Sequence, residues 1–354
     1  MNKIKTVVVG CGNIANTYAE QISKYNQIEL AGFCDLQPGR AVEFARKHGG
    51  KAYRSLDEAL EDASIALVIN LTIHHAHFEV ISRCLEAGKH VHTEKPLATS
   101  GAEARQLVAL AERKGLRLSS APSVFLSEPI QTLARELRAG RAGTLRLLYA
   151  EQNQGRIETW HPNPEPFYKV GPLWDIAVYP LGIWAVTCGP MRKVTAVGKS
   201  LLRERQTKDG RPFTIGASDF YTALIEFENG VLGRLTSNFY VRPSKQAGSM
   251  EFHGDDGSLF LENLNFDTPV EFAPFGGAFA PLPLVRNGSS GVEFARGVED
   301  LADAILNNRP HRCDARVAQH VVEVIEAIHL SAETGKSATI TSTFDIPEPM
   351  PWAR

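Results

Sequence analysis

The chain has 354 residues, of which 43% are hydrophobic and 22% charged, and its formal net charge at pH 7 is −2. At roughly 150 residues per domain, this length predicts two domains that each bury a core. The small net charge gives no reason to expect nucleic acid or an anionic membrane as a partner. Five scattered cysteines favour a reducing compartment, and no apolar run is long enough to span a membrane. We therefore expect a soluble cytoplasmic protein without a signal peptide.

The first 121 residues alternate short apolar runs with helical stretches. The expected strands are residues 4–10, 29–34, a short one near residue 52, 65–72, the run that begins at residue 89, and 116–120. The helices between them are typical of right-handed βαβ units. This pattern predicts an α/β fold in residues 1–121, a doubly wound parallel sheet of the Rossmann type.

Residues 122–354 show longer strand patterns and form the second expected domain. The expected strands are 144–153, 193–201, 217–228, 231–241, 248–254 and 257–262, and the expected helices are 127–139, 176–188, 293–307 and 315–335. Asn229-Gly230 predicts a hairpin turn, because this pair suits positive φ angles. Residues 266–291 lack a clear period and are interpreted as a long loop. The prediction is an α+β domain with a large, mainly antiparallel sheet.

A glycine-rich turn follows the first expected strand, with the pattern Gly10-x-Gly12-x-x-Ala15. In a dinucleotide site the first glycine allows a tight turn and the second lets the backbone approach a pyrophosphate. The backbone N–H groups at the start of the following helix, at Asn13 and Ile14, would then meet the anion. The alternative is a turn with a structural role alone.

An acidic residue closes the second expected strand, as a dinucleotide site requires. Asp35 lies 23 residues after Gly12 and can accept hydrogen bonds from the ribose hydroxyls of adenosine. Its charge would repel a 2′-phosphate, which favours NAD as the cofactor, with NADP as the alternative. Arg40 on the following helix could offset part of that repulsion.

The run from Lys89 to Pro96 contains two histidines, an acid and a second lysine. His90, His92 and Glu94 alternate and could share a face as metal ligands. Helices cover both faces of a parallel sheet, so we interpret these histidines as packing residues and expect no metal. Pro96 keeps the preceding Lys95 extended at the carboxyl edge of the sheet, where such folds bind ligands. The alternative is an ordinary surface lysine.

Asp175 and Tyr179 are four residues apart, so a helix would point both in one direction. Asp175 could instead cap the helix, and Tyr179 could be a core residue with a satisfied hydroxyl. Pro180 also disfavours a regular helix at Tyr179. Spacing alone leaves these alternatives open.

With these residues in view, the chain resembles the glucose–fructose oxidoreductase, inositol dehydrogenase and rhizopine catabolism family (Gfo/Idh/MocA) over nearly its whole length. The motifs that carry the resemblance are Gly10-x-Gly12-x-x-Ala15, Asp35, Ala87-Gly88-Lys89-His90-Val91, Glu94-Lys95-Pro96 and Gly171…Asp175…Tyr179. The resemblance implies a C-terminal domain with an open-faced sheet, a homodimer or homotetramer formed through that sheet, and NAD(P)-dependent redox chemistry on a sugar or cyclitol. It also places Thr72, His77, Glu94 and Lys95 on the cofactor side.

The resemblance also implies roles for three residues in hydride transfer. Tyr179 is the expected general acid/base, Lys95 polarises the reacting oxygen and lowers the pKa of the tyrosine, and Asp175 orients Lys95 or holds a substrate hydroxyl. Lys95 could itself carry the proton. The residues expected to line the sugar pocket are Asn153, Trp160, His161 and Tyr168. Many family members have histidine in place of Tyr179, and Trp160-His161 stands where a Trp-Arg pair is frequent.

Three functions of different class fit these motifs. The first is a sugar or cyclitol dehydrogenase or reductase. The second is a glycosidase or lyase that uses bound NAD for transient oxidation. The third is a sensor that binds a dinucleotide without catalysis. Steady production of NADH would support the first, substrate cleavage without net reduction of NAD the second, and cofactor binding without turnover the third.

Overall fold

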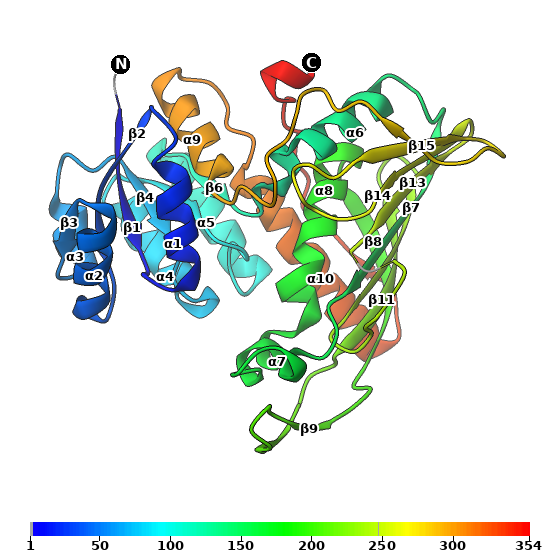
Figure 1. Ribbon diagram of the computed structural model, residues 1–354, viewed down its shortest axis with the longest axis horizontal. Coiled ribbons are helices and arrows are strands. Elements are labelled where there is room, and N and C mark those ends of the chain that lie inside the picture. The colour runs from blue at the N-terminus through cyan, green and yellow to red at the C-terminus, as the bar shows by residue number, and fades with distance from the viewer. Residues whose placement is uncertain (1–2, 247) are drawn as a thin grey trace. The chain divides into compact units, whose positions relative to one another are not determined.

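The structure is a computed structural model that describes residues 3–246 and 248–354 (Figure 1). The chain divides into two compact units. The first comprises Met1–Leu126 and Glu293–Val322, and the second comprises Ser127–Val292 and Glu323–Arg354.

A parallel sheet of six strands forms the centre of the first unit. Its strands are β1 (Ile4–Val9), β2 (Ile28–Cys34), β3 (Lys51–Tyr53), β4 (Leu67–Asn70), β5 (His90–Thr93) and β6 (Leu118–Ser120). Their order in the sheet is β3-β2-β1-β4-β5-β6. This is the doubly wound order of dinucleotide-binding folds, so the predicted fold class is confirmed.

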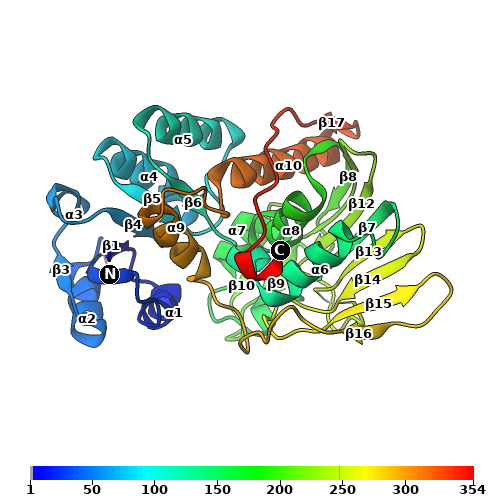
Figure 2. The ribbon, with the colours of Figure 1, turned by 90° about the horizontal axis from the view of Figure 1, so that it is seen from above.

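Helices cover both faces of this sheet. They are α1 (Asn13–Ile22), α2 (Pro38–His48), α3 (Leu56–Glu61), α4 (His77–Glu86), α5 (Gly101–Lys114) and α9 (Arg296–Leu306). Figure 2 shows α1 and α2 on one side of the sheet and α4 and α5 on the other. The local sequence sets the helix starts: Pro38 begins α2, and the Ser55 and Ser100 hydroxyls accept N–H groups of the first turns of α3 and α5.

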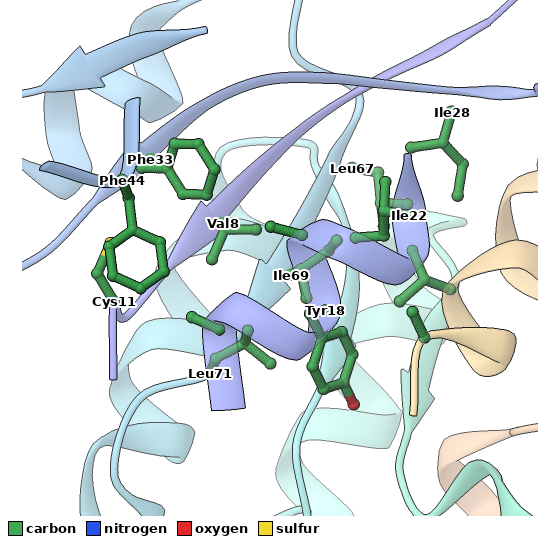
Figure 3. Close-up of a cluster of buried hydrophobic side chains, with 14 of the residues drawn as sticks. Val8, Cys11, Tyr18, Ile22, Ile28, Phe33, Phe44, Leu67, Ile69 and Leu71 are labelled. Atoms are coloured by element: carbon green, nitrogen blue, oxygen red, sulfur yellow. The ribbon is translucent and has the colours of Figure 1, made fainter. Parts of the chain in front are cut away.

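One hydrophobic core packs α1 and α9 against the sheet. Tyr18 and Ile22 of α1 lie among Val8, Phe33 and other strand residues, as Figure 3 shows. Four buried residues of the α9 region complete this core: Ala295, Val298, Leu301 and Ala302. The first unit therefore includes a late segment of the chain. The sequence prediction of 1–121 and 122–354 placed that segment in the second domain, because a helical pattern does not show which sheet the helix covers.

The second unit is built on a mixed sheet of nine strands. They are β7 (Leu145–Asn153), β8 (Met191–Lys199), β11 (Phe220–Phe227), β12 (Leu232–Asn238), β13 (Met250–Gly254), β14 (Gly257–Leu261), β15 (Val270–Pro274), β16 (Ala280–Leu282) and β17 (Ala338–Thr339). The order is β16-β15-β14-β13-β7-β12-β11-β8-β17. Only β7 and β12 pair in parallel among these strands. The expected mainly antiparallel sheet is confirmed.

Helices lie on one face of the nine-stranded sheet. They include α6 (Glu128–Arg138), α8 (Val178–Cys188) and the end of α10 (Ala315–Thr334), and Figure 1 shows α6 and α8 on the same side. On the other face, Val197 and Leu224 are each 61% exposed. The strands thus alternate buried and exposed residues, as expected for an open-faced sheet. Within the described part of the chain, no helix has both the length and the apolar composition needed to cross a bilayer.

The predicted loop over 266–291 is wrong in part, because it contains β15 and β16. The strand Val270–Pro274 pairs with β14, and Ala280–Leu282 pairs with β15. Neither segment has a clear period by itself, so the neighbouring edge of the sheet determines its conformation. A short hairpin of β9 (Glu204–Gln206) and β10 (Pro212–Thr214) and the helix α7 (Glu165–Pro172) were also not predicted.

Candidate active site

The glycine turn of the first unit has the shape that a pyrophosphate site requires. Gly10 has a φ of +96°, and a Cβ at this position would lie 2.7 Å from the carbonyl carbon of Leu71. Glycine is therefore needed both for its conformation and for the close approach. A Cβ on Gly12 would meet nothing within 4 Å. The helix α1 begins directly after this turn, at Asn13, and Ile14 follows in its first turn. This arrangement of a glycine turn and a helix N-terminus is the one that a dinucleotide phosphate site requires.

Asp35 links the end of β2 to the glycine turn. Its Oδ2 accepts the N–H of Cys11 at 2.8 Å, and its Oδ1 accepts the N–H of Gln37 at 2.8 Å. Burial, with a further contribution from the Asp35 charge, raises the pKa of the Cys11 thiol to about 12. Arg40 opposes that shift, so its charge acts within electrostatic reach of the turn. Asp35 and Arg40 thus both lie close to the predicted nucleotide site.

Two loops that follow β4 and β5 are joined through His77. This residue is 1% exposed, and its Nδ1 and Nε2 lie 2.6 Å from the Pro96 carbonyl oxygen and 3.0 Å from the Thr72 carbonyl oxygen. Burial lowers the pKa of His77, so the ring is neutral at pH 7 and donates only one hydrogen bond. Each ring nitrogen faces a backbone carbonyl oxygen. His77 thus lies between the carbonyl oxygens of Thr72 and Pro96, one of which accepts its single N–H.

Asn70 is a buried residue of this edge that the sequence analysis missed. Its Nδ2 donates to Thr93 Oγ1 at 3.0 Å, and its Oδ1 accepts from Thr72 Oγ1 at 2.7 Å. The contacts join the ends of β4 and β5. An asparagine closing a buried apolar strand was the available signal, since a buried amide needs partners.

Glu94 fixes the backbone at Lys95. Its Oε1 accepts from the hydroxyl of Tyr18, a buried residue of α1, at 2.7 Å, and its Oε2 accepts the N–H of Lys95 at 3.1 Å. Lys95 itself is half-buried. The glycine turn follows β1, and Lys95 follows β5, so both lie at the carboxyl edge of one parallel sheet. This is the edge at which doubly wound folds bind ligands.

The histidines of β5 form hydrogen bonds with β6 and with the residue that precedes it. His90 Nδ1 accepts the N–H of Arg117 at 2.9 Å, and His92 Nδ1 lies 2.9 Å from Ser119 Oγ. Burial lowers the pKa of His90 to about 4 and that of His92 to about 3. No group of three potential metal ligands occurs among residues 3–246 and 248–354.

In the second unit, Asp175 and Tyr179 lie on either side of a change in helix type. Gly171, with a φ of +79°, kinks the end of α7, and a π-helical turn, Leu173–Ala177, that contains Asp175 follows. α8 then begins at Val178, with Tyr179 and Pro180 in its first turn, where proline is tolerated. Both Asp175 and Tyr179 are half-buried. The expected helix 176–188 therefore begins two residues later, after a wider turn.

Tyr168 belongs to a buried ionic network. Its hydroxyl donates to Glu158 Oε2 at 2.5 Å and accepts the N–H of Ile157 at 3.2 Å. Arg205 Nη1 lies 2.7 Å from Glu158 Oε1, and its Nη2 pairs with Asp219. Desolvation and the bond to Glu158 raise the pKa of Tyr168 strongly. The hydroxyl predicted to line the sugar pocket therefore stabilises the segment that leads to Trp160.

Trp160 and His161 form an aromatic group with Phe167 of α7. The rings of Trp160 and Phe167 pack edge to face with centroids 5.9 Å apart, and those of His161 and Phe167 do so at 4.8 Å. Trp160 is 39% exposed. A partly exposed aromatic surface of this kind suits contact with the C–H face of a sugar.

Asn153 lies on the open side of the nine-stranded sheet. Its register partner Asn238 donates to Asn153 Oδ1 at 2.5 Å, and Asn153 Nδ2 donates to Ser244 Oγ at 3.3 Å. The preceding Gln152 points to the opposite, buried face, which it shares with Ser237. Ser237 Oγ donates to the carbonyl of Pro172, immediately before the turn with Asp175. Strand alternation thus places Gln152, which was not predicted, on the side of that turn.

Two models of one family match the chain. Residues 4–121 match the model described as an oxidoreductase family with an NAD-binding Rossmann fold, GFO_IDH_MocA. Residues 130–260 match the C-terminal domain model of the same family.

Curated relatives and solved structures agree with this match. Trans-1,2-dihydrobenzene-1,2-diol dehydrogenase of Bos taurus is 31% identical over 65% of this chain and 66% of its own length, just under two thirds. A crystal structure of an NAD binding oxidoreductase from Klebsiella pneumoniae has a TM-score of 0.87 and 19% identity over 96% of this chain and 99% of that chain.

Two similar structures were solved with a nicotinamide cofactor. A levoglucosan dehydrogenase in complex with NADH and L-sorbose has a TM-score of 0.84 and 19% identity over 96% of this chain and 99% of that chain. A 3-ketoreductase from Actinomadura kijaniata, in complex with TDP-benzene and NADP, has a TM-score of 0.74 and 23% identity over 94% and 98%. Since the two family models together match residues 4–121 and 130–260, well over half of the chain, the chain belongs to the GFO/IDH/MocA oxidoreductase family.

Proposed function

We propose that this protein is an NAD(P)-dependent oxidoreductase that interconverts a hydroxyl and a carbonyl group on a sugar, a sugar derivative or a cyclitol. The observation that carries the proposal is the common edge of the parallel sheet, where the open glycine turn follows β1 and Lys95 follows β5. A diol dehydrogenase and a levoglucosan dehydrogenase among the similar proteins support a polyhydroxylated substrate.

In the proposed chemistry, oxidation of a CH–OH carbon releases a hydride and a proton. The bound nicotinamide supplies the acceptor for the hydride. Tyr179 takes the hydroxyl proton, and in reduction it returns that proton to the new oxygen. A free tyrosine has a pKa of about 10, so it needs a nearby ammonium to act near neutral pH. Lys95 is the proposed ammonium, and Asp175 the group that orients it or holds a substrate hydroxyl.

We propose NAD as the preferred cofactor, since the Asp35 carboxylate lies against the glycine turn and would repel a 2′-phosphate. Arg40 offsets only part of that repulsion, so NADP is expected to bind, but less tightly than NAD. The five cysteines are free and buried, which supports a reducing compartment such as the cytoplasm. We also propose a homodimer or homotetramer formed through the open face of the nine-stranded sheet.

The test is a spectrophotometric panel of sugars, sugar acids, cyclitols, trans-1,2-diols and glycosides with NAD and with NADP. For the best substrate, Lys95→Ala and Tyr179→Phe should each lower kcat by about 100-fold or more, as loss of general acid/base catalysis does. The cofactor Kd of Tyr179→Phe should stay unchanged in isothermal titration.

Lys24→Ala, a change on an exposed residue after α1, is the matched control and should keep full activity. Normal turnover by both active-site variants would refute the site. Cleavage of a glycoside without net NADH would favour transient oxidation instead. Cofactor binding without turnover of any panel compound would favour a sensor.

A further inference from the structure

Gln152 is a polar residue placed where an apolar one would be expected. It lies on β7, on the face that it shares with Leu148 and Ala150, both of which are fully buried. Gln152 itself is 7% exposed. Its Nε2 is buried and has no hydrogen-bond partner among the residues that the structure describes. A buried N–H donor without a partner destabilises the folded chain, so the presence of this Nε2 calls for a functional reason.

The position of Gln152 connects it to the turn that carries Asp175. In the parallel pair of β7 and β12, Gln152 is opposite Ser237, so the two side chains share one face of the sheet. Ser237 is fully buried, and its Oγ donates to the carbonyl oxygen of Pro172 at 3.0 Å. Pro172 immediately precedes the π-helical turn Leu173–Ala177. The side chain of Gln152, with its unpartnered Nε2, therefore lies on the same side of the sheet as that turn.

We propose that Gln152 is a substrate-binding residue whose amide donates a hydrogen bond to an oxygen of a polyhydroxylated substrate. The proposal rests on the function proposed above and adds a contact that determines specificity. A hydroxyl or carbonyl oxygen is the complement of the free N–H, and a carboxamide can also accept from a hydroxyl. The ligand supplies the partner that the folded chain lacks. A compound without an oxygen at this point would leave the amide unpaired and would bind less tightly.

This role predicts opposite effects of one substitution on stability and on activity. Gln152→Met keeps the length of the side chain and removes the amide. The free variant should melt about 2–4 °C higher than the wild type, because a buried unpaired donor is gone. Its kcat/KM should fall about tenfold or more, since one hydrogen bond to the substrate is lost. Its Kd for NAD should not change.

The control is Gln106→Met, the same change on the exposed side of α5, which should alter neither the melting temperature nor kcat/KM. A series of single-deoxy analogues of the best substrate supplies a second readout. One analogue should lose affinity for the wild type but bind wild type and Gln152→Met equally. Unchanged kcat/KM in Gln152→Met, or a lower melting temperature, would overturn the proposal, because the amide would then have a structural partner such as an internal water.

The experiment separates this inference from the function on which it rests. If the wild type turns over no panel compound, the proposed function fails. The binding of D-glucose, L-sorbose, myo-inositol and trans-1,2-cyclohexanediol, measured by isothermal titration, still tests Gln152. Binding by the wild type that is at least tenfold weaker in Gln152→Met supports the contact. Equal binding by both proteins, or no binding of any of these compounds, overturns it.

Discussion

Two histidines of β5, the half-buried His90 and the fully buried His92, make the folded state sensitive to acid. Burial lowers the pKa of His92 to about 3 and that of His90 to about 4, whereas an unfolded histidine titrates near 6.5. As the pH falls below about 6.5, the unfolded chain binds protons that the folded chain does not. The free energy of unfolding should therefore decrease by up to about 1.4 kcal/mol per pH unit for each histidine between pH 6 and pH 4, and stay flat above pH 7 as far as these groups are concerned.

Urea unfolding of the wild type and of His92→Gln from pH 7 to pH 4 tests this prediction. The variant should lose part of the slope, because one of the two groups no longer titrates. His75→Gln, at an exposed position before α4, is the control and should keep the wild-type slope. An unchanged slope in His92→Gln would show that His92 does not couple folding to pH.

At the scale of secondary structure elements, Arg205 joins the segment that contains Glu158 and Tyr168 to the start of the strand pair at Asp219. It is fully buried between Glu158 and Asp219, and its Cζ lies 4.5 Å from the ring centroid of Tyr168. Arg205→Met would leave two buried carboxylates without their cation, and breaking such a pair costs about 3–5 kcal/mol. Chemical denaturation should show that loss. Arg211→Met removes an arginine from an exposed pair with Glu165 and should cost at most about 1 kcal/mol. Similar losses in the two variants would contradict the network's role.

The sequence predicted those helices and strands whose own residues show a regular pattern of apolar side chains or a capping residue. The apolar runs of β1, β4 and β11 and the serine caps of α3 and α5 need only local information. The strands β15 and β16 do not, because pairing with the edge of β14 decides their conformation. The π-helical turn before α8 was likewise not visible, since its spacing of Asp175 and Tyr179 also fits an α-helix.

For the site, the sequence indicated the glycine turn, Asp35 and Lys95, because strand ends and glycines mark a doubly wound edge. It did not indicate that the hydroxyl of Tyr168 is held by Glu158 and Ile157, which are brought to it by the fold. It indicated Asn153 on the open face of β7 and gave no sign of the buried Gln152 beside it. Alternation along β7 separates the two faces, but only burial identifies which face is covered by helices.

At the scale of the whole molecule, the open sheet face presents exposed apolar side chains on three adjacent strands. Val197 of β8 and Leu224 of β11 are each 61% exposed, and Leu232 of β12 is 48% exposed. These three strands are neighbours in the order β12-β11-β8. Exposed apolar side chains on a sheet face that no helix covers favour association. In a symmetric dimer, the same face of each copy packs against the other, so these side chains are buried in both copies. The proposed oligomer should therefore depend on this face.

Leu224→Lys should convert the oligomer into a monomer, because an interface would have to bury two unpaired ammonium groups at its centre. Sedimentation velocity at several protein concentrations measures the change. Val42→Lys, at a residue of α2 that is 58% exposed, introduces the same charge on the other unit and should leave the oligomer intact. If the wild type sediments as a monomer, or if Leu224→Lys sediments like the wild type, the sheet face is not the interface. If Leu224→Lys is monomeric and keeps its turnover with the best substrate, each copy carries a complete site, and association serves stability rather than catalysis.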